Sequence, residues 1–217
     1  MISIQSIASS LHKQLDHVNA VPLENVISFA RSRGRKRRTV MTLHLVPIGG
    51  ILDWNEFGDE ELSAIVLACF DADSCTFQTV AAVDYSEDME PALEELSDYM
   101  RPNKDQSYDM GTASSVQTDG QAQSTITCDI WFDPVQVWEV EADLQYLTQS
   151  NEFTAAAMKS GVSAQGIGFV SPKPTSSKEK SSSAIKFVRL CCDEWDNTGV
   201  EEATTSDAVL HAFVVNQ

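Results

Sequence analysis

Hydrophobic residues occur in short runs along this chain, and three successive runs have the composition of β-strands. The runs cover residues 40–48, 64–70 and 77–83, and apolar or β-branched side chains dominate each of them. Asp-Ala-Asp-Ser at residues 71–74 separates the second run from the third and is typical of a turn. The pattern predicts three strands, of which the second and third form a hairpin.

The hydrophobic period changes at residues 86–100. Met89, Leu93, Leu96 and Met100 recur at helical spacing, and acidic residues follow Ser86 directly. A serine before an acidic first turn is a favourable start for a helix, because its hydroxyl can accept a backbone N–H. We therefore predict an acidic amphipathic helix with Ser86 as its N-cap.

The second half of the chain alternates polar stretches with shorter ordered segments. Residues 102–127 and 171–184 contain few large apolar groups and are typical of long loops. The other segments predict a strand around Trp138 within residues 128–144, a short helix at 153–159, a strand at 185–192 and a terminal helix at 204–213. Thr205 or Ser206 is the predicted N-cap of the terminal helix.

Five short strands with helices between and after them indicate a mainly β fold with accessory helices. Strands of this number and length close most economically into a small, partly open barrel of the OB type. We expect a five-stranded OB-fold barrel over residues 39–217, with long polar insertions at 102–127 and 171–184. Residues 1–38 form a predicted helical and basic N-terminal extension, whose helical pattern breaks at Pro22.

Charge is distributed unevenly along the chain. The sequence has 15 Lys and Arg against 32 Asp and Glu, for a formal net charge of −17. Six of the basic residues lie close together, at Arg31, Arg33, Arg35, Lys36, Arg37 and Arg38. The acidic remainder counts against strong, unaided binding of nucleic acid. The basic run has three interpretations: a phosphate-contacting arm, a nuclear import signal, or a solvated loop that offsets the acidic body.

Two protein classes are disfavoured by the sequence. No apolar run approaches the roughly 18 residues that a membrane span needs, and the N-terminus lacks the pattern of a secretory signal.

The cysteines are odd in number and form no Cys-x-x-Cys pair; they are Cys69, Cys75, Cys128, Cys191 and Cys192. We expect buried or reduced thiols in a reducing compartment, with neither a disulfide framework nor a metal site.

The most specific pattern lies around Trp138. Residues 131–144 contain Trp-Phe-Asp-Pro, then Val-Trp-Glu-Val and Ala-Asp-Leu. This stretch closely resembles one in the C-terminal OB-fold domain of ATP-dependent DNA ligases of the eukaryotic and archaeal type. Other pieces resemble that domain in the same order, at residues 42–49, 67–71 with 77–80, 85–88 with 94–96, and 186–189 with 202–206. The resemblance covers roughly residues 40–212.

The nucleophile of that family is missing. In ligases the upstream adenylation domain carries a Lys-x-Asp-Gly motif, whose lysine amine attacks ATP. The nearest match here, Gln117-Thr-Asp-Gly120, has no nucleophilic amine and is assigned to chance. We predict no catalytic residue in this chain. The resemblance implies that ATP and magnesium would be used only if an adenylation domain were supplied.

The family's phosphate-binding motifs are altered as well. Arg31-Ser-Arg33 stands near the place of a Lys-x-Lys pair, and Cys191-Cys192-Asp193-Glu194 stands where the family has Arg-x-Asp-Lys. Only Asp193 is preserved in the second motif. Glu194 replaces a lysine and would repel a polyphosphate. The loop at 171–184 offers an alternative: its length could shift the register, and its lysines, Lys173, Lys178 and Lys180, could supply cations in place of the lost pair.

The resemblance implies the C-terminal OB-fold portion of a DNA ligase, which grips nicked duplex DNA during nick sealing in replication or repair. Such a domain binds DNA weakly alone and needs an adenylation domain in cis or in trans. The candidate phosphate contacts are the basic residues of 31–38, together with Lys186 and Arg189. These side chains would position the duplex without reading its bases. The basic run favours a nuclear location, with an organelle as the alternative.

Two other functions stay open. In the first, a catalytically dead, ligase-derived OB domain acts as a protein-interaction module in a larger assembly, because acidic surfaces favour basic protein partners. In the second, an isolated OB protein binds single strands by stacking bases on Trp131, Trp138 and Phe187. Alternation within its strand favours the core for Trp138. The acidic residues between Asp53 and Glu61 are interpreted as a solvated loop.

Overall fold

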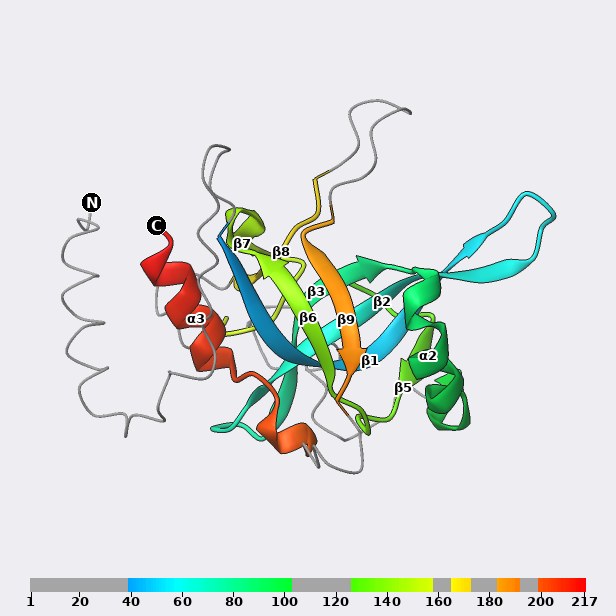
Figure 1. Ribbon diagram of the computed structural model, residues 1–217, viewed down its shortest axis with the longest axis horizontal. Coiled ribbons are helices and arrows are strands. Elements are labelled where there is room, and N and C mark those ends of the chain that lie inside the picture. Colours follow the sequence, from blue (N-terminus) through cyan, green and yellow to red (C-terminus); the bar gives the residue numbers. More distant parts are fainter. Residues whose placement is uncertain (1–38, 103–125, 158–164, 173–182, 192–198) are drawn as a thin grey trace.

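The computed structural model describes residues 39–102, 126–157, 165–172, 183–191 and 199–217. These residues form the mainly β fold with accessory helices that the sequence predicts (Figure 1). The strands are β1 (Val40–Trp54), β2 (Glu60–Asp71), β3 (Thr76–Asp84), β4 (Met100–Pro102), β5 (Ile130–Phe132), β6 (Trp138–Asp143), β7 (Leu147–Ser150), β8 (Gly166–Phe169) and β9 (Ile185–Leu190). The helices are α2 (Glu90–Leu96) and α3 (Ser206–Val215), with single 3₁₀ turns η2 (Glu87–Met89), η3 (Ser97–Tyr99), η4 (Leu144–Tyr146) and η5 (Val200–Glu202).

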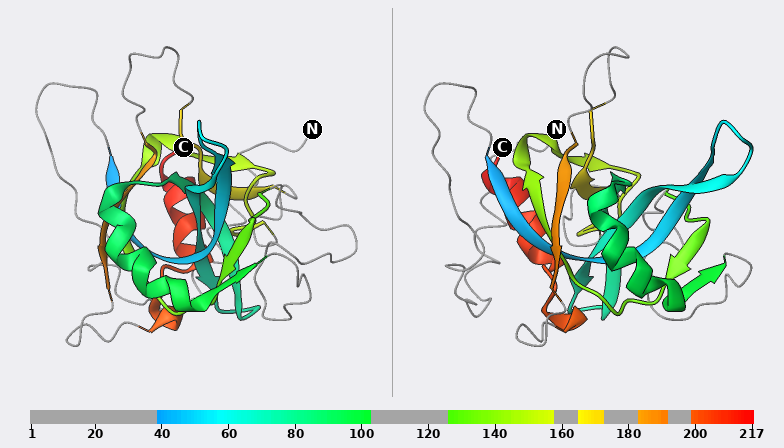
Figure 2. Two further views of the ribbon diagram at one scale, coloured as in Figure 1. Left: turned by 90° about the vertical axis from the view of Figure 1, so that its right-hand side faces the viewer. Right: turned by 45° about the vertical axis from the view of Figure 1, so that its right-hand side comes forward.

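Strand β1 organises the sheet because its two halves have different partners. Its first half pairs antiparallel with β6, and its second half pairs antiparallel with β2. Strand β2 continues into β3 through the predicted hairpin, and β3 pairs in parallel with β8. Strand β6 also pairs with β9, and β8 with β7. The result is one strongly curled sheet whose strands bend around a common core (Figures 1 and 2).

The sequences of β1 and β2 explain which of their side chains are buried in the core. Every second residue of early β1, beginning with Met41, points into a core that Trp138 of β6 and Leu96 of α2 also fill. Residues 65–69 of β2 are buried on both faces, because a second cluster with Val46, Ile48 and Val137 covers the other side. A continuous apolar run is the pattern expected of such a doubly buried strand.

The two predicted long helices are present, with changed limits. The predicted helix 86–100 divides into η2, α2 and η3, and Met100 belongs to β4. Ser86 makes no side-chain cap; its carbonyl accepts a hydrogen bond from the Met89 N–H instead. The terminal helix is confirmed as α3. Its N-cap is Thr205, whose hydroxyl accepts from the Ala208 N–H at 3.3 Å.

The predicted helix at 153–159 is wrong in its described part, residues 153–157, which form a turn. The backbone N–H groups of Thr154 and Ala155 donate to the Thr79 carbonyl of β3, so tertiary contacts replace helical bonds. Ala156 has a φ of 54°, which an α-helix does not allow. A tertiary partner therefore overrides the local propensity of three successive alanines.

The described residues form nine strands where five were predicted. Strands β7 and β8 lacked a sequence signal, because β7 is polar and β8 contains two glycines. Strand β1 also extends to Trp54 and β2 begins at Glu60, so the segment 53–61, predicted as a solvated loop, is the end of a β-hairpin. The N-terminal extension 1–38 and the cores of both insertions, 103–125 and 173–182, lie outside the described residues. None of the helices in the described part has the length and apolar character required to span a membrane.

Candidate functional site

The predicted phosphate contacts fall into two groups. Residues 31–38, with Arg31, Arg33, Arg35, Lys36, Arg37 and Arg38, lie outside the described residues, as do Asp193 and Glu194 of the altered final motif. Lys186 and Arg189 lie on β9, and Cys191 follows directly after that strand. Within the described ranges, Arg101 is the only other Lys or Arg.

Arg189 faces a carboxylate across the β6–β9 pairing. Its register partner is Glu139 of β6, and the Arg189 Nε donates to the Glu139 Oε2 at 2.8 Å. The arginine side chain is 46% exposed and the glutamate side chain 21%, so the ion pair lies at the surface. A phosphate approaching Arg189 would therefore compete with a carboxylate that is already in place.

Lys186 lies in a similarly acidic setting. Its register partner on β6 is Glu141, and both residues line an open pocket of about 560 Å³. Glu87 and Asp88 of η2 line the same pocket. This pocket offers one cation against three carboxylates, and such a lining repels an anionic ligand.

The aromatic side chains proposed for base stacking are mostly internal. Trp138 is fully buried and Phe187 is 8% exposed. Their rings pack edge to face, with centroids 4.9 Å apart. Only Trp131 of the three is half-buried at the surface. Trp138 therefore belongs to the core, as its strand alternation predicts, and Phe187 packs against it.

Among the described residues, the most exposed aromatic side chains lie on the β1–β2 hairpin, whose acidic residues were predicted to form a solvated loop. Trp54 is 68% exposed and Phe57 is 89% exposed. The side chains of Asp53, Glu56, Asp59, Glu60 and Glu61 are exposed around them. We call this segment, residues 53–61, the acidic arm; it projects from the body in Figure 1. In the sequence, Trp54 and Phe57 stand among five acidic residues, and this combination could have indicated a binding surface. The solvated-loop prediction considered only the acidic residues.

The tip of the acidic arm is an organised turn. The Asn55 Oδ1 accepts hydrogen bonds from the Phe57 N–H and the Asp59 N–H, each at 2.9 Å. Gly58 has a φ of 84°, a conformation that glycine adopts readily. The Asn55 amide also donates to the Glu61 carboxylate at 2.7 Å. These bonds hold the exposed aromatic side chains on a defined backbone.

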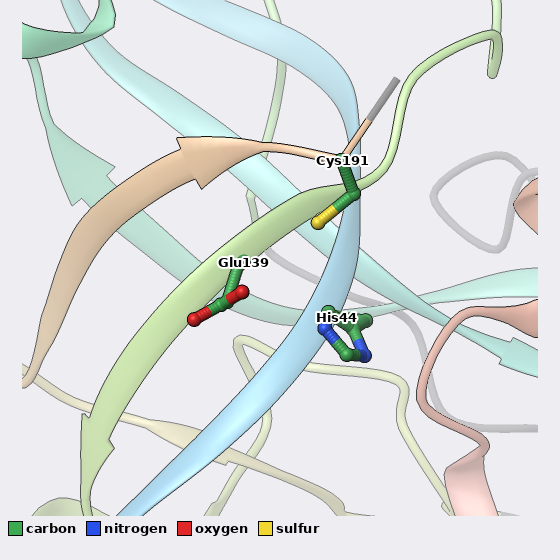
Figure 3. Close-up of side chains that lie close together, drawn as sticks. All are labelled: His44, Glu139 and Cys191. Atoms are coloured by element: carbon green, nitrogen blue, oxygen red, sulfur yellow. The ribbon is translucent and has the colours of Figure 1, made fainter. Parts of the chain in front are cut away.

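A second group of chemically active side chains lies where β1, β6 and β9 meet. His44, Glu139 and Cys191 each direct one potential ligand atom to a shared space, and these atoms lie within 4.8 Å of one another (Figure 3). In the sequence, Cys191 was interpreted only as a reduced thiol and as part of the altered final motif. Only the strand pairing brings the three together, so no local motif could have identified the group.

The other described cysteines are chemically distinct. Cys69 and Cys128 are buried, and Cys75 is exposed. Burial raises the pKa of the Cys128 thiol from 9.0 to about 12, and the negative charge of Asp129 adds to this effect. Cys128 is therefore a protonated, packed thiol at neutral pH and a poor nucleophile.

No protein-family profile and no curated protein sequence matches this chain.

Proposed function

We propose that this chain is a DNA-ligase-type OB domain that serves as a protein-interaction module, and that its acidic arm docks a Lys- and Arg-rich segment of a partner protein. The observation that carries the proposal is the charge of the described surface. Lys186 and Arg189, the two sheet cations expected to hold phosphate, both face carboxylates. The projecting arm presents aromatic and acidic side chains together.

Strand pairing supports the OB part of the proposal. A small five-stranded barrel closes when its first strand pairs with a neighbour on each of its two edges and its last strand pairs with the third strand. Here β1 pairs with β2 and β6, β3 pairs in parallel with β8, and β6 pairs with β9. We interpret β8 and β9 as two parts of one barrel strand, divided by the insertion at 171–184.

The position of the acidic arm argues against a DNA grip. In OB folds the loop between the first two strands is one of the loops that bind oligonucleotides. The corresponding segment here is the acidic arm, whose five carboxylates would repel a phosphate backbone. The same carboxylates attract lysine and arginine side chains and steer a basic partner towards the tip.

The exposed aromatic rings supply the short-range part of recognition. Lysine and arginine bind over the faces of tryptophan and phenylalanine, with a free energy of about 0.5–1 kcal/mol per exposed contact. Trp54 and Phe57 are accessible for such contacts and for apolar packing. The hydrogen-bonded turn at Asn55 keeps both rings on one tip, which lowers the entropic cost of ordering the site.

Charge reversal on the acidic arm tests this proposal. The variant Glu56→Lys/Asp59→Lys should weaken binding of a fluorescein-labelled octa-arginine peptide at least tenfold in fluorescence anisotropy. The matched control Glu94→Lys/Asp98→Lys changes the net charge equally at exposed positions of α2 and η3. It should weaken binding by less than about twofold. Equal losses in both variants would show that the peptide senses only net charge, and the docking proposal would be rejected.

A DNA-gripping ligase portion is the second candidate, and the Trp-Glu strand β6 with its ligase-like sequence favours it. In this case residues 31–38 would contact the phosphates, and an adenylation domain would act in cis or in trans. Duplex binding by such a domain falls by orders of magnitude across a fourfold salt increase. Fusion to a competent adenylation domain should then restore nick sealing. An interaction module binds the duplex feebly at all salt concentrations and seals no nick in the fusion.

A further inference from the structure

We propose that His44, Glu139 and Cys191 form a binding site for a zinc-class divalent metal ion. This site is separate from the acidic arm, and its ligand Glu139 pairs with Arg189, one of the predicted phosphate contacts. Its three donors come from three adjacent strands: His44 from β1, Glu139 from β6, and Cys191 from the residue after β9. The side chains converge on one face of the sheet (Figure 3).

The spacing of the donor atoms suits a small metal ion. One imidazole nitrogen, one carboxylate oxygen and the Cys191 sulfur lie within 4.8 Å of one another. Around a tetrahedral zinc ion, with bonds of about 2.0–2.3 Å, neighbouring donors lie roughly 3.3–3.7 Å apart. A contraction of at most about 1.5 Å between donor atoms therefore completes the geometry.

The backbone under the site is fixed by hydrogen bonds. His44 and Glu139 are register partners in the β1–β6 pairing. The His44 N–H donates to the Thr204 hydroxyl at 2.9 Å, and the Thr204 N–H donates to the His44 carbonyl at 2.7 Å. The Cys191 N–H donates to the Val137 carbonyl at 2.8 Å. Metal binding consequently costs little backbone ordering.

The donor set selects the class of ion. Thiolate and imidazole favour zinc and its transition-metal neighbours, whereas magnesium and calcium prefer all-oxygen sites. One thiolate and one carboxylate balance the charge of a divalent ion, and three protein ligands leave a fourth position for water. Cys191, which is 2% exposed, would bind the ion as a thiolate.

Arg189 defines how Glu139 can bind. Its Nε donates to the Glu139 Oε2, so the Oε1 is the oxygen that can turn to the metal. A hydrogen-bonded neighbour of this kind orients a ligating carboxylate. The guanidinium charge also opposes that of the metal, so we expect moderate affinity. Replacing Arg189 by glutamine should tighten metal binding, since the amide keeps a donor and removes the charge.

Cobalt(II) titration of the full chain tests the site. Co²⁺ replaces zinc and gives a near-ultraviolet thiolate-to-metal absorption band when a cysteine binds it. We expect this band in the wild-type protein, its loss in Cys191→Ser, and its retention in Cys75→Ser and Cys192→Ser. Absence of the band in the wild type, or its persistence in Cys191→Ser, would overturn the proposal.

A second variant covers the case in which Cys191→Ser fails to fold. Glu139→Gln removes a surface carboxylate and should weaken Co²⁺ binding at least tenfold. The matched control Glu141→Gln changes an exposed residue of the same strand and should leave the affinity within about twofold of wild type. Equal affinities in the two glutamine variants would exclude Glu139 from the site and contradict the proposal.

Discussion

Replacing Gln136 by leucine should destabilise the fold strongly, because this side chain links β6 to α2 inside the protein. Gln136 is 4% exposed, and its Oε1 accepts from the Trp138 indole N–H at 3.0 Å. Its amide donates to the Ala92 carbonyl at 3.2 Å and to the Glu95 carboxylate at 3.3 Å. Leucine has a similar volume but removes every one of these bonds.

The cost follows from the groups that lose partners. Each lost hydrogen bond contributes about 1 kcal/mol to the free energy of unfolding, and a buried polar group left without a partner costs about 1–3 kcal/mol. The indole N–H of Trp138 becomes such a group, since this residue is fully buried. We expect Gln136→Leu to lower the free energy of unfolding by about 2–4 kcal/mol.

A double-mutant cycle with Trp138→Phe isolates the indole contribution. Phenylalanine keeps an aromatic ring beside Phe187 and has no N–H to lose a partner. In this background Gln136→Leu should cost about 1–2 kcal/mol less than in the wild type. Urea unfolding followed by far-ultraviolet circular dichroism measures all four proteins without relying on tryptophan fluorescence. Additivity within about 0.5 kcal/mol would refute the proposed hydrogen bond.

Two further predictions concern other buried groups. Because burial raises the Cys128 pKa from 9.0 to about 12, the folded protein keeps this proton while the unfolded chain releases it. Stability relative to Cys128→Ala should therefore fall by about 1.4 kcal/mol per pH unit between pH 9 and 12, and a flat difference would contradict this. In Gly168→Ala, the added Cβ would meet the Phe153 ring and stand 2.6 Å from the Val80 carbonyl oxygen, so urea unfolding should show a loss of about 1–3 kcal/mol. In Gly199→Ala, the added Cβ would meet no atom of the described residues within 4 Å, so this variant should lie within about 0.5 kcal/mol of wild type; equal effects would reject the packing argument.

Local sequence patterns identified the strands and helices whose own residues carry a clear apolar run or capping signal. Apolar runs predict the strands β1, β2 and β3, and the N-cap at Thr205 helps to predict the helix α3. The turn at residues 153–157 was missed because its backbone bonds go to Thr79, far away in the sequence. Strands β7 and β8 are held by pairing and by close packing at glycine, neither of which is visible in composition.

The candidate sites also depend on contacts between strands that local sequence patterns do not reveal. Lys186 and Arg189 were predicted as phosphate contacts from their charge and their ligase-like context. Only the register of β6 against β9 sets Glu141 and Glu139 opposite them. The proximity of His44, Glu139 and Cys191 likewise depends on the pairing of β1, β6 and β9. Charge along the sequence indicates which partners a surface attracts, but cross-strand register decides which charges remain available.

The proposed function has two parts: the acidic arm recognises a basic protein segment, and the domain does not grip DNA. Its most direct test compares wild-type binding of octa-arginine peptide and of nicked duplex DNA in the same buffer, at ionic strengths of about 50 and 200 mM. We predict measurable peptide affinity that Trp54→Ala/Phe57→Ala reduces, and feeble duplex binding at both salt concentrations. Tight duplex binding that falls by orders of magnitude with salt, together with peptide binding indifferent to both aromatic residues, would contradict it.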